Sequence, residues 1–398
     1  MTLIGHVAMS SGGEGFAEKL LPGGRRLLYV AHESGPHCFT IVDVTEPAAP
    51  QTVRTVDTPA AGTRCNSLDV NANVLVVAAE TQEQGQAGGG IRVYALDDPA
   101  RPKLVAYFDT SGPHSRGVHH VWLSSDKLAH ITSGSADFTP NRARPDDQFY
   151  RIVDLSDPAH PKEAGRWWYP GQRAGDADPA PVPVPMVNMA GNAVRPHNID
   201  VFPSRANRAY VAYLDAGIVI LDIADVAHPR TVGTVRYVAP FTHTVLPLFS
   251  RNLLVVSEED TEDNCTDEPK RISVWDIADE TKPRLLSVVP YAANTAELCK
   301  RGGRFGPHNL YENKPYGPTF KSDRFVVSSW FNGGVRIFDL ADPVHPKEAA
   351  YYVPATPPDS PKHAAQTNDV FVDDRGIIFA CDRYTGGLDI LRSDVLAP

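Results

Sequence analysis

The chain has 398 residues, of which 42% are hydrophobic and 22% are charged, and its formal net charge at pH 7 is −10. The negative charge and the lack of a basic cluster argue against nucleic acid as a partner, and no stretch approaches the roughly 20 apolar residues of a membrane-spanning helix. The N-terminal segment lacks the basic start and apolar centre of a signal peptide, and five scattered cysteines without a CxxC pair favour reduced thiols. We therefore expect a cytoplasmic protein.

One motif recurs along the chain: a short apolar run, an aspartate, another apolar residue and a proline-rich turn. Its copies lie at 41–51, 93–103, 152–162, 221–230, 274–284 and 337–347, and a copy without prolines follows at 387–394. Equivalent positions of successive copies lie 52 to 68 residues apart. A repeat of this length without helical periodicity is typical of a β-propeller.

Each repeat contains four short apolar runs rich in β-branched and aromatic residues, as strands require. These runs are clearest in the fourth repeat, at 197–202, 208–214, 217–223 and 231–238. The pattern predicts an all-β fold, a seven-bladed propeller of four-stranded antiparallel blades. The proline-rich turn then joins the third and fourth strands, because proline cannot donate to a sheet and ends an edge strand. Three histidines inside these turns should be structural or indifferent surface residues: His160, His228 and His345.

The two ends of the chain predict how the ring closes. The last repeat has only three strands before the C-terminus, so residues 3–7 should supply its fourth strand and bring Met1 close to Pro398. Residues 1–398 would then form a single domain, although length alone suggests two or three.

The recurring IVD, LDI and IFD runs resemble those of the LVIVD-repeat proteins, and the resemblance covers essentially the whole chain, including its closing segment 368–391. It implies the propeller fold and leaves the reaction open. The layout is also distantly similar to two groups of seven-bladed metalloenzymes, the carotenoid cleavage oxygenases and the selenium-binding methanethiol oxidases. In the carotenoid cleavage oxygenases, four histidines from different innermost strands hold one Fe(II). This similarity implies an axial histidine cluster and says nothing of the substrate.

Histidine recurs at one position of the repeat, the start of the innermost strand. In blades two to seven this position holds Asn66, His119, His197, His243, His308 and Asn368, and blade one offers Glu14 or a neighbour. Innermost strands line the central channel, so four imidazoles should meet at one mouth of it. His120 should face away, because neighbouring residues of a strand point to opposite sides. The alternative is that each histidine only satisfies a local hydrogen bond.

Four neutral imidazoles suit Fe(II), Cu, Zn or Ni, and do not suit Ca²⁺ or Mg²⁺. We expect one divalent transition metal ion, Fe(II) in preference to Cu or Zn, with four ligands: His119, His197, His243 and His308. The ion should sit toward blades three to six, which leaves open space for a small-molecule substrate beside blades seven, one and two.

Charged residues are expected around the same mouth, where the connections between second and third strands emerge. These connections supply the candidate catalytic residues Glu80, Asp215, Glu258 and Arg383. Such groups serve as bases or orient ligand imidazoles. The candidate substrate-binding residues are Arg64, Arg116, Arg195, Arg304, Asn66, Asn368 and Trp330. An equally open alternative is that the arginines pair with the acids.

Two unusually long connections, at 165–197 and 289–308, lead into innermost strands. Long loops in compact folds are usually functional or disordered, so we expect a lid on the histidine face, with a stiff proline-rich run at 179–185. The pattern as a whole favours a metal-dependent oxygenase or oxidase for a small aromatic or unsaturated molecule, and the arginines point to an anionic group on it. A metal-assisted hydrolase or lyase with the same ligands is the second interpretation, and a non-catalytic propeller that binds a protein through this face is the third.

Overall fold

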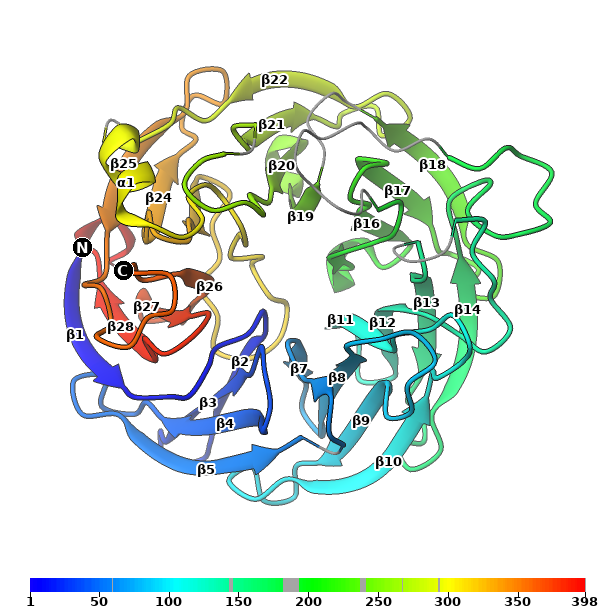
Figure 1. Ribbon diagram of the computed structural model, residues 1–398, viewed down its shortest axis with the longest axis horizontal. Helices are drawn as coiled ribbons and strands as arrows, with labels where there is room; N and C mark the ends of the chain where they lie inside the picture. The colour runs from blue at the N-terminus through cyan, green and yellow to red at the C-terminus, as the bar shows by residue number, and fades with distance from the viewer. Residues whose placement is uncertain are drawn as a thin grey trace.

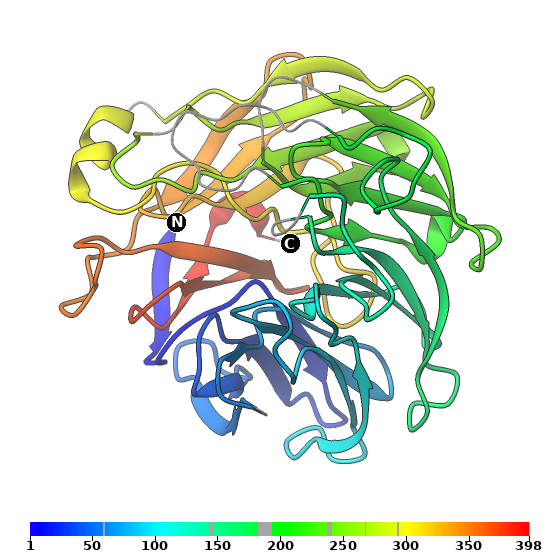
Figure 2. The ribbon, with the colours of Figure 1, turned by 45° about the vertical axis from the view of Figure 1, so that its right-hand side comes forward.

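In the computed structural model, which describes residues 1–58, 60–142, 146–181, 193–236, 241–266, 268–292 and 294–397, the strands form seven sheets around one axis (Figure 1). Each sheet is one blade. The chain runs around the ring in order, as the change of colour from blue to red shows in both views (Figures 1 and 2). The prediction of an all-β, seven-bladed propeller is confirmed.

The first three blades follow the expected four-strand order. Blade one contains β2 (Phe16–Leu20), β3 (Arg26–Ala31), β4 (His37–Asp43) and β5 (Gln51–Asp57). The innermost strand of blade two is split in two pieces that both pair with the next strand: β6 (Thr63–Arg64), β7 (Leu68–Val70), β8 (Val74–Thr81), β9 (Gly90–Ala95) and β10 (Lys103–Asp109). Blade three contains β11 (Val118–Leu123), β12 (Leu128–Ser133), β13 (Phe149–Asp154) and β14 (Lys162–Trp167).

Blades four and five are built in the same way. Blade four contains β15 (Ile199–Asp200), β16 (Arg208–Ala212), β17 (Ile218–Asp222) and β18 (Arg230–Val235). Its strands fall within the four predicted runs or start one residue before them, and the predicted end of the last run, 237–238, lies outside the described residues. Blade five contains β19 (Thr242–Leu248), β20 (Leu253–Glu258), β21 (Ile272–Asp276) and β22 (Arg284–Val288).

Blade six departs from the pattern at its axis. Its regular strands are β23 (Phe325–Ser329), β24 (Val335–Asp339) and β25 (Lys347–Tyr352). The innermost segment runs beside β23 without forming a regular strand, because only isolated hydrogen bonds join the two. The His308 N–H donates to the Ser329 carbonyl at 3.0 Å and the Tyr311 N–H to the Val327 carbonyl at 2.8 Å.

Blade seven joins the two ends of the chain and closes the ring. It contains β26 (Thr367–Val372), β27 (Ile377–Asp382), β28 (Leu388–Arg392) and, at the rim, β1 (Thr2–Val7). β1 pairs antiparallel with β28, with Thr2 opposite Arg392 and Val7 opposite Leu388, and blue β1 lies against red β28 in Figure 1. The expected closure is confirmed. Pro398, the expected neighbour of Met1, lies outside the described residues.

Burial decreases from the axis of the ring to its rim. Every residue of β8 is buried, whereas every residue of the outer strand β10 is exposed or half-buried. The inner strands are covered on both faces by neighbouring blades, so they are apolar almost throughout, as at 74–79. This packing is what makes the repeat visible in the sequence.

The aspartate of the motif stabilises the turn that follows the third strand. Its carboxylate accepts a hydrogen bond from the backbone N–H two residues later, at 3.1 Å for Asp43 and 2.8 Å for Asp154 and Asp339. This Asx-turn geometry explains why the repeat carries an aspartate there. In three of these turns an exposed histidine places its Nδ1 2.8 or 2.9 Å from an aspartate three residues earlier: His160, His228 and His345.

The described residues also include short helices. There are three 3₁₀ turns, η1 (Pro203–Arg205), η2 (Phe249–Arg251) and η3 (Asp394–Leu396), and one α-helix, α1 (Thr295–Arg301). α1 lies in the long connection 289–308, where the sequence pattern predicts no element. In the other long connection, residues 182–192, which include most of the proline-rich run, lie outside the described residues. No described helix has the length and apolar character needed to cross a membrane.

Four of the five cysteines form disulfides, so the expectation of reduced thiols is wrong. Cys38 pairs with Cys65 and Cys265 with Cys299, while Cys381 is a buried free thiol. The partners are 27 and 34 residues apart and meet because the fold brings separate segments together, which the spacing of cysteines in a sequence does not reveal. Structural disulfides are rare in the cytosol, so the cysteines give no support to a cytoplasmic location.

Candidate metal centre

Four histidines from four consecutive blades meet on the inner side of the ring. His119 lies in β11 and His243 in β19, and His197 and His308 stand at the start of the innermost segments of blades four and six. Ring centroids of successive members are 4.2, 3.8 and 4.2 Å apart, and none of the four is more than 3% exposed. The predicted histidines therefore meet because they occupy equivalent positions in successive blades.

The outward nitrogen of each ring has a polar partner that orients it. Three of these contacts are to carboxylate, amide or hydroxyl oxygens: His119 Nδ1 to Glu80 at 2.9 Å, His197 Nδ1 to Asn198 at 2.8 Å and His243 Nδ1 to Thr244 at 2.9 Å. The fourth is from His308 Nδ1 to the Asn368 carbonyl at 2.5 Å. Acceptors at Nδ1 hold the proton on that nitrogen and leave the Nε2 lone pair free.

The inward nitrogens lack ordinary partners. His243 Nε2 and His308 Nε2 are buried without a hydrogen-bond partner among the described residues, and His119 Nε2 lies 2.7 Å from His197 Nε2. Buried polar atoms are nearly always satisfied, and each exception needs an explanation. A bound cation would satisfy all four lone pairs at once.

Two glutamates face the same point. The Glu14 carboxylate lies 3.4 Å from Nε2 of both His119 and His308, and 3.9 Å from that of His197. The Glu259 carboxylate lies 3.6 Å from His308 Nε2 and 3.8 Å from His243 Nε2. These side chains form three overlapping groups that could hold a metal ion, in each of which the ligand atoms lie within 4.8 Å of one another.

Glu14 reaches the histidines from blade one, and together with Arg64 of blade two and Arg383 of blade seven it lines an adjoining pocket. Sequence reasoning placed Glu14 at the equivalent position of blade one but left its register open, and of the two adjacent acids at the channel mouth it chose Glu258 rather than Glu259 as a candidate catalytic residue. The neighbouring Glu258 instead accepts a hydrogen bond from the Arg271 N–H at 2.9 Å. Strand alternation, which sends neighbouring side chains to opposite sides, is the signal that separates this pair.

The electrostatics of the cluster match a metal-binding role. Burial, followed by the neighbouring imidazoles, holds the pKa of His197 and of His243 well below the usual value, so both rings are neutral. Burial alone would raise the pKa of Glu14, but the neighbouring imidazoles of His119, His308 and His197 outweigh burial and hold that pKa well below its usual range. Two neutral imidazoles beside an ionised carboxylate are donors suited to Fe, Cu or Zn, whereas at His119 the carboxylates of Glu80 and Glu14 outweigh burial and raise the pKa.

Glu80 is the carboxylate that orients His119, and it is only 1% exposed. The same group pairs with Arg64 at 2.6 Å and Arg116 at 3.1 Å, and it accepts a hydrogen bond from Gln148 at 3.0 Å. Burial would raise the pKa of Glu80, but Arg64, His119 and Arg116 outweigh burial and hold it well below the usual value. A carboxylate with these partners positions the histidine and is a poor base.

A pocket of about 440 Å³ opens beside the cluster. Its lining combines cluster residues, arginines and parts of the blade-five loops: Glu14, Arg64, His119, Arg195, His197, Phe241, Glu259, Thr261, Glu262, Arg304 and Arg383. Arg195 and Arg304 come from the two long connections. Most of the candidate arginines also pair with acids: Arg64 and Arg383 with Glu33, Arg116 with Asp147, and Arg304 with Glu259.

The other candidate residues do not line the pocket. Asn66 and Asn368 stand behind the histidines, where the Asn66 amide lies 3.4 Å from His119 Nδ1 and the Asn368 side chain accepts from Arg383 at 2.9 Å. Trp330 packs in the blade-six core against Phe305 and Phe338. Two candidate acids are buried elsewhere, and burial raises their pKa, to about 7 for Asp215 and about 8 for Glu258.

His119 rather than His120 faces the cluster. The chain bulges between Val118 and His120, and His120, although 3% exposed, has an Nδ1 without a hydrogen-bond partner among the described residues. Burial and nearby Lys314 lower the pKa of His120 well below its usual value. The two adjacent histidines therefore face different surroundings, as strand alternation predicts.

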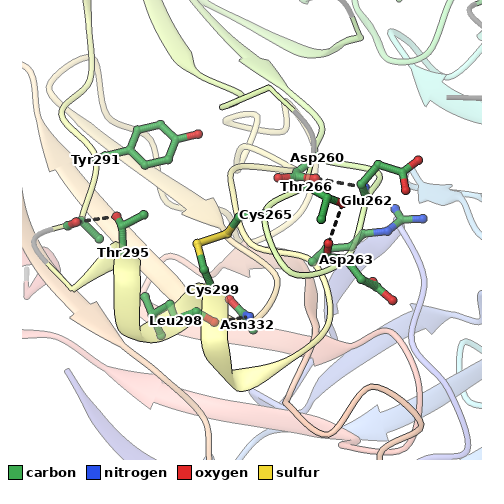
Figure 3. Close-up of a disulfide and its surroundings, with 12 residues drawn as sticks. Asp260, Glu262, Asp263, Cys265, Thr266, Tyr291, Thr295, Leu298, Cys299 and Asn332 are labelled. Carbon is green, nitrogen blue, oxygen red and sulfur yellow. Dashed lines mark hydrogen bonds between the residues drawn. A yellow bond between two sulfur atoms is a disulfide. The ribbon is translucent and has the colours of Figure 1, made fainter. Parts of the chain in front are cut away.

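A disulfide crosslinks the loops at the edge of the pocket (Figure 3). Cys265 belongs to the loop after β20 that also carries Glu259, and Cys299 belongs to α1, which precedes Arg304. The Asn332 amide donates to the Leu298 carbonyl at 2.8 Å and so ties α1 to blade six. The covalent link joins the two segments whose side chains meet in the ion pair between Glu259 and Arg304.

Fold and cluster together define a seven-bladed β-propeller with buried histidines and glutamates at its axis. The chain carries LVIVD repeats, since the family model described as LVIVD repeat matches residues 28–58, 147–168 and 206–236. Among solved structures, the β-propeller domain of Cps50 (Swd1) from Myceliophteria thermophila is similar, with 12% sequence identity and a TM-score of 0.58 over 97% of this chain and 99% of that chain. At this identity the likeness shows the fold alone. No curated protein matches the chain in sequence.

Proposed function

We propose that the protein is a metal-dependent enzyme in which the Nε2 atoms of His119, His197, His243 and His308 hold one divalent transition metal ion. The observation that carries this proposal is the contrast between the two nitrogens of each ring: each Nδ1 has an oxygen partner, whereas two of the buried Nε2 atoms have none among the described residues. Fe(II) is the favoured ion, with Cu and Zn as alternatives.

The proposed reaction is oxidation of a small aromatic or unsaturated molecule in the adjoining pocket. A redox-active ion supplies the activation of O₂ or of the substrate. The protein holds the four imidazoles rigidly, since each is buried in an innermost segment and oriented at Nδ1. Glu14, ionised and part of the pocket lining, can orient a bound molecule by accepting a hydrogen bond at its carboxylate.

The second candidate function is a hydrolase or lyase that uses the same four ligands with a non-redox ion such as Zn²⁺. The position of Glu14 favours it, because a carboxylate 3.4 Å from two of the proposed ligands can accept a hydrogen bond from an attacking water and orient it. The third interpretation, a non-catalytic propeller that binds a protein, gives no use for four inward imidazoles.

Elemental analysis of protein purified without a His tag tests the metal site. We expect stoichiometric iron or copper in the wild type, and its loss in His197→Ala and in His243→Ala. His228→Ala, which removes an exposed turn histidine, is the matched control and should keep the metal. Stoichiometric zinc would favour the hydrolase or lyase. A metal-free wild type, together with variants that fold like it, would contradict both functions.

We also propose that the protein works in an oxidising compartment and not in the cytoplasm, because two disulfides join loops of its ring. Thiol titration of the denatured chain without reductant should then detect Cys381 alone. Five reactive thiols in protein from its native source would contradict this location.

A further inference from the structure

Four arginines line the pocket beside the histidine cluster, and three of them are neutralised by carboxylates. Arg64 pairs with Glu33 and Glu80, Arg383 with Glu33 at 2.7 Å, and Arg304 with Glu259 at 2.8 Å. These three therefore act first as structural cations within the wall of the pocket.

The fourth, Arg195, has no carboxylate partner among the described residues, although it is only 8% exposed. Its Nη1 donates to the Gln148 side-chain oxygen at 3.0 Å and to the Pro196 carbonyl at 3.3 Å. Its Nε is buried, and no described residue gives it a hydrogen-bond partner. A buried cation that lacks a counter-charge is strongly disfavoured, so this guanidinium is suited to receive an anion from outside the chain.

Gln148 explains why, among the described residues, no carboxylate pairs directly with Arg195. The other three arginines each contact a glutamate, whereas Arg195 contacts this glutamine. Its amide oxygen accepts a hydrogen bond without carrying a charge. The Gln148 amide nitrogen donates in turn to Glu80 at 3.0 Å, and Glu80 holds His119. Arg195 is thus fixed by the same hydrogen-bond network that orients one of the cluster histidines.

We propose that the pocket binds a small organic carboxylate, with Arg195 as the residue that recognises the carboxylate group. A guanidinium offers paired, parallel N–H groups, the arrangement that pairs with both oxygens of a carboxylate. Arg195 precedes the cluster residue His197 by two positions, so the rest of the bound acid lies beside the histidines. This inference rests on the proposed function, because it names the class of substrate for that site.

The shape of the pocket fits the same ligand class. Phe241, which has a backbone φ of 75° and directly precedes the segment with His243, lines the pocket together with Arg195. Positive φ is costly for a residue with a side chain. An aromatic face next to a guanidinium suits a small acid with an apolar body, and the volume of about 440 Å³ excludes large polymers from full enclosure.

Calorimetric titration with formate, acetate and benzoate tests the proposal, with acetamide and benzamide as neutral counterparts. We expect at least one of the acids to bind the wild type saturably, and its amide to bind at least about tenfold more weakly. Arg195→Gln should weaken binding of the acid by about tenfold or more. Arg195→Lys, which keeps the charge but not the paired N–H groups, should also bind more weakly than the wild type. Arg284→Gln, which removes an exposed arginine from an outer strand, should bind as the wild type does.

Three results would overturn the proposal: no saturable binding of any of the acids, equal binding of acid and amide, or unchanged binding in both Arg195 variants. Thermal melting of each variant ensures that lost binding is not lost folding. Metal content is measured on the same samples. Absence of metal with Arg195-dependent binding would refute the proposed metal enzyme while leaving carboxylate recognition intact, whereas full metal content with Arg195-independent binding would refute the recognition alone.

Discussion

Glu80 is the residue through which the proposed metal ligand His119 can be tested. It fixes His119 through Nδ1 and is itself held by Arg64, Arg116 and Gln148. Glu80→Gln keeps the shape but removes the charge, so we expect metal affinity to fall by about 10- to 100-fold. Competition with a chelator of known affinity measures this change. The exposed Glu46→Gln is the control, and equal affinities in the two variants would show that Glu80 does not act on the metal site.

His130 gives the protein an acid sensitivity that is unrelated to the cluster. It is fully buried in blade three, with Nδ1 2.6 Å from the Tyr150 hydroxyl and Nε2 2.7 Å from the Ser124 hydroxyl. Burial lowers its pKa to about 3, whereas an unfolded histidine titrates near 6.5. The folded pKa is the lower one, so this stabilisation is present above pH 6.5 and is lost as pH falls toward 3.

His130→Gln should therefore flatten the loss of stability at low pH. Between pH 6 and 4, the free energy of unfolding should fall faster with decreasing pH in the wild type than in His130→Gln. The two slopes should differ by up to about 1.4 kcal/mol per pH unit, which corresponds to one proton. Urea denaturation at several pH values measures both slopes. His160→Gln, at an exposed turn position, should leave the slope unchanged, and a His130→Gln slope equal to that of the wild type would refute the assignment.

At the level of elements, strands can be predicted from the sequence, whereas contacts between distant segments cannot. The run 217–223 matches β17 because an inner strand is buried on both sides and its apolar residues mark it. The clustering of the four histidines can be predicted for a related reason, since all four occupy the same position of the repeat. The position of Glu14 depends on the register of an irregular segment, and the pairing of Cys265 with Cys299 depends on how the loop after β20 lies against α1. Neither leaves a periodic trace in the sequence.

The loop after β20 and α1 form an element whose order depends on one covalent bond. We propose that this element is part of a lid over the pocket, with the Cys265–Cys299 disulfide closing a loop between positions 34 residues apart. Cys265→Ser with Cys299→Ser should destabilise the protein by up to about 4 kcal/mol. Hydrogen exchange should rise in 259–266 and 295–304, while β12 and β13 serve as an internal control. Unchanged exchange in these loops would show that the other contacts of α1 suffice to hold the lid.

For the whole molecule, closure of the ring links stability to the two ends of the chain. An open ring would leave β28 as an unprotected edge strand, and such edges invite aggregation. β1 covers that edge, and it adds the contact of His6 with Asp389 at 2.8 Å. Because every blade packs against two neighbours, we propose that residues 1–398 form a single domain that unfolds as one cooperative unit.

Removal of residues 1–8 tests this closure. The truncation deletes β1, exposes β28 and removes Val7 from the core cluster of blade seven, so we expect a lower melting temperature and a greater tendency to aggregate. Hydrogen exchange should increase first in β27 and β28, and less in β2 to β5 of blade one, although blade one follows the deleted segment directly in the sequence. A full-length variant in which Gly and Ser replace residues 2–7 separates loss of the strand from loss of chain length, and it should behave like the truncation. If either variant melts like the intact protein, then β1 does not close the ring in solution and blade seven is stable with three strands.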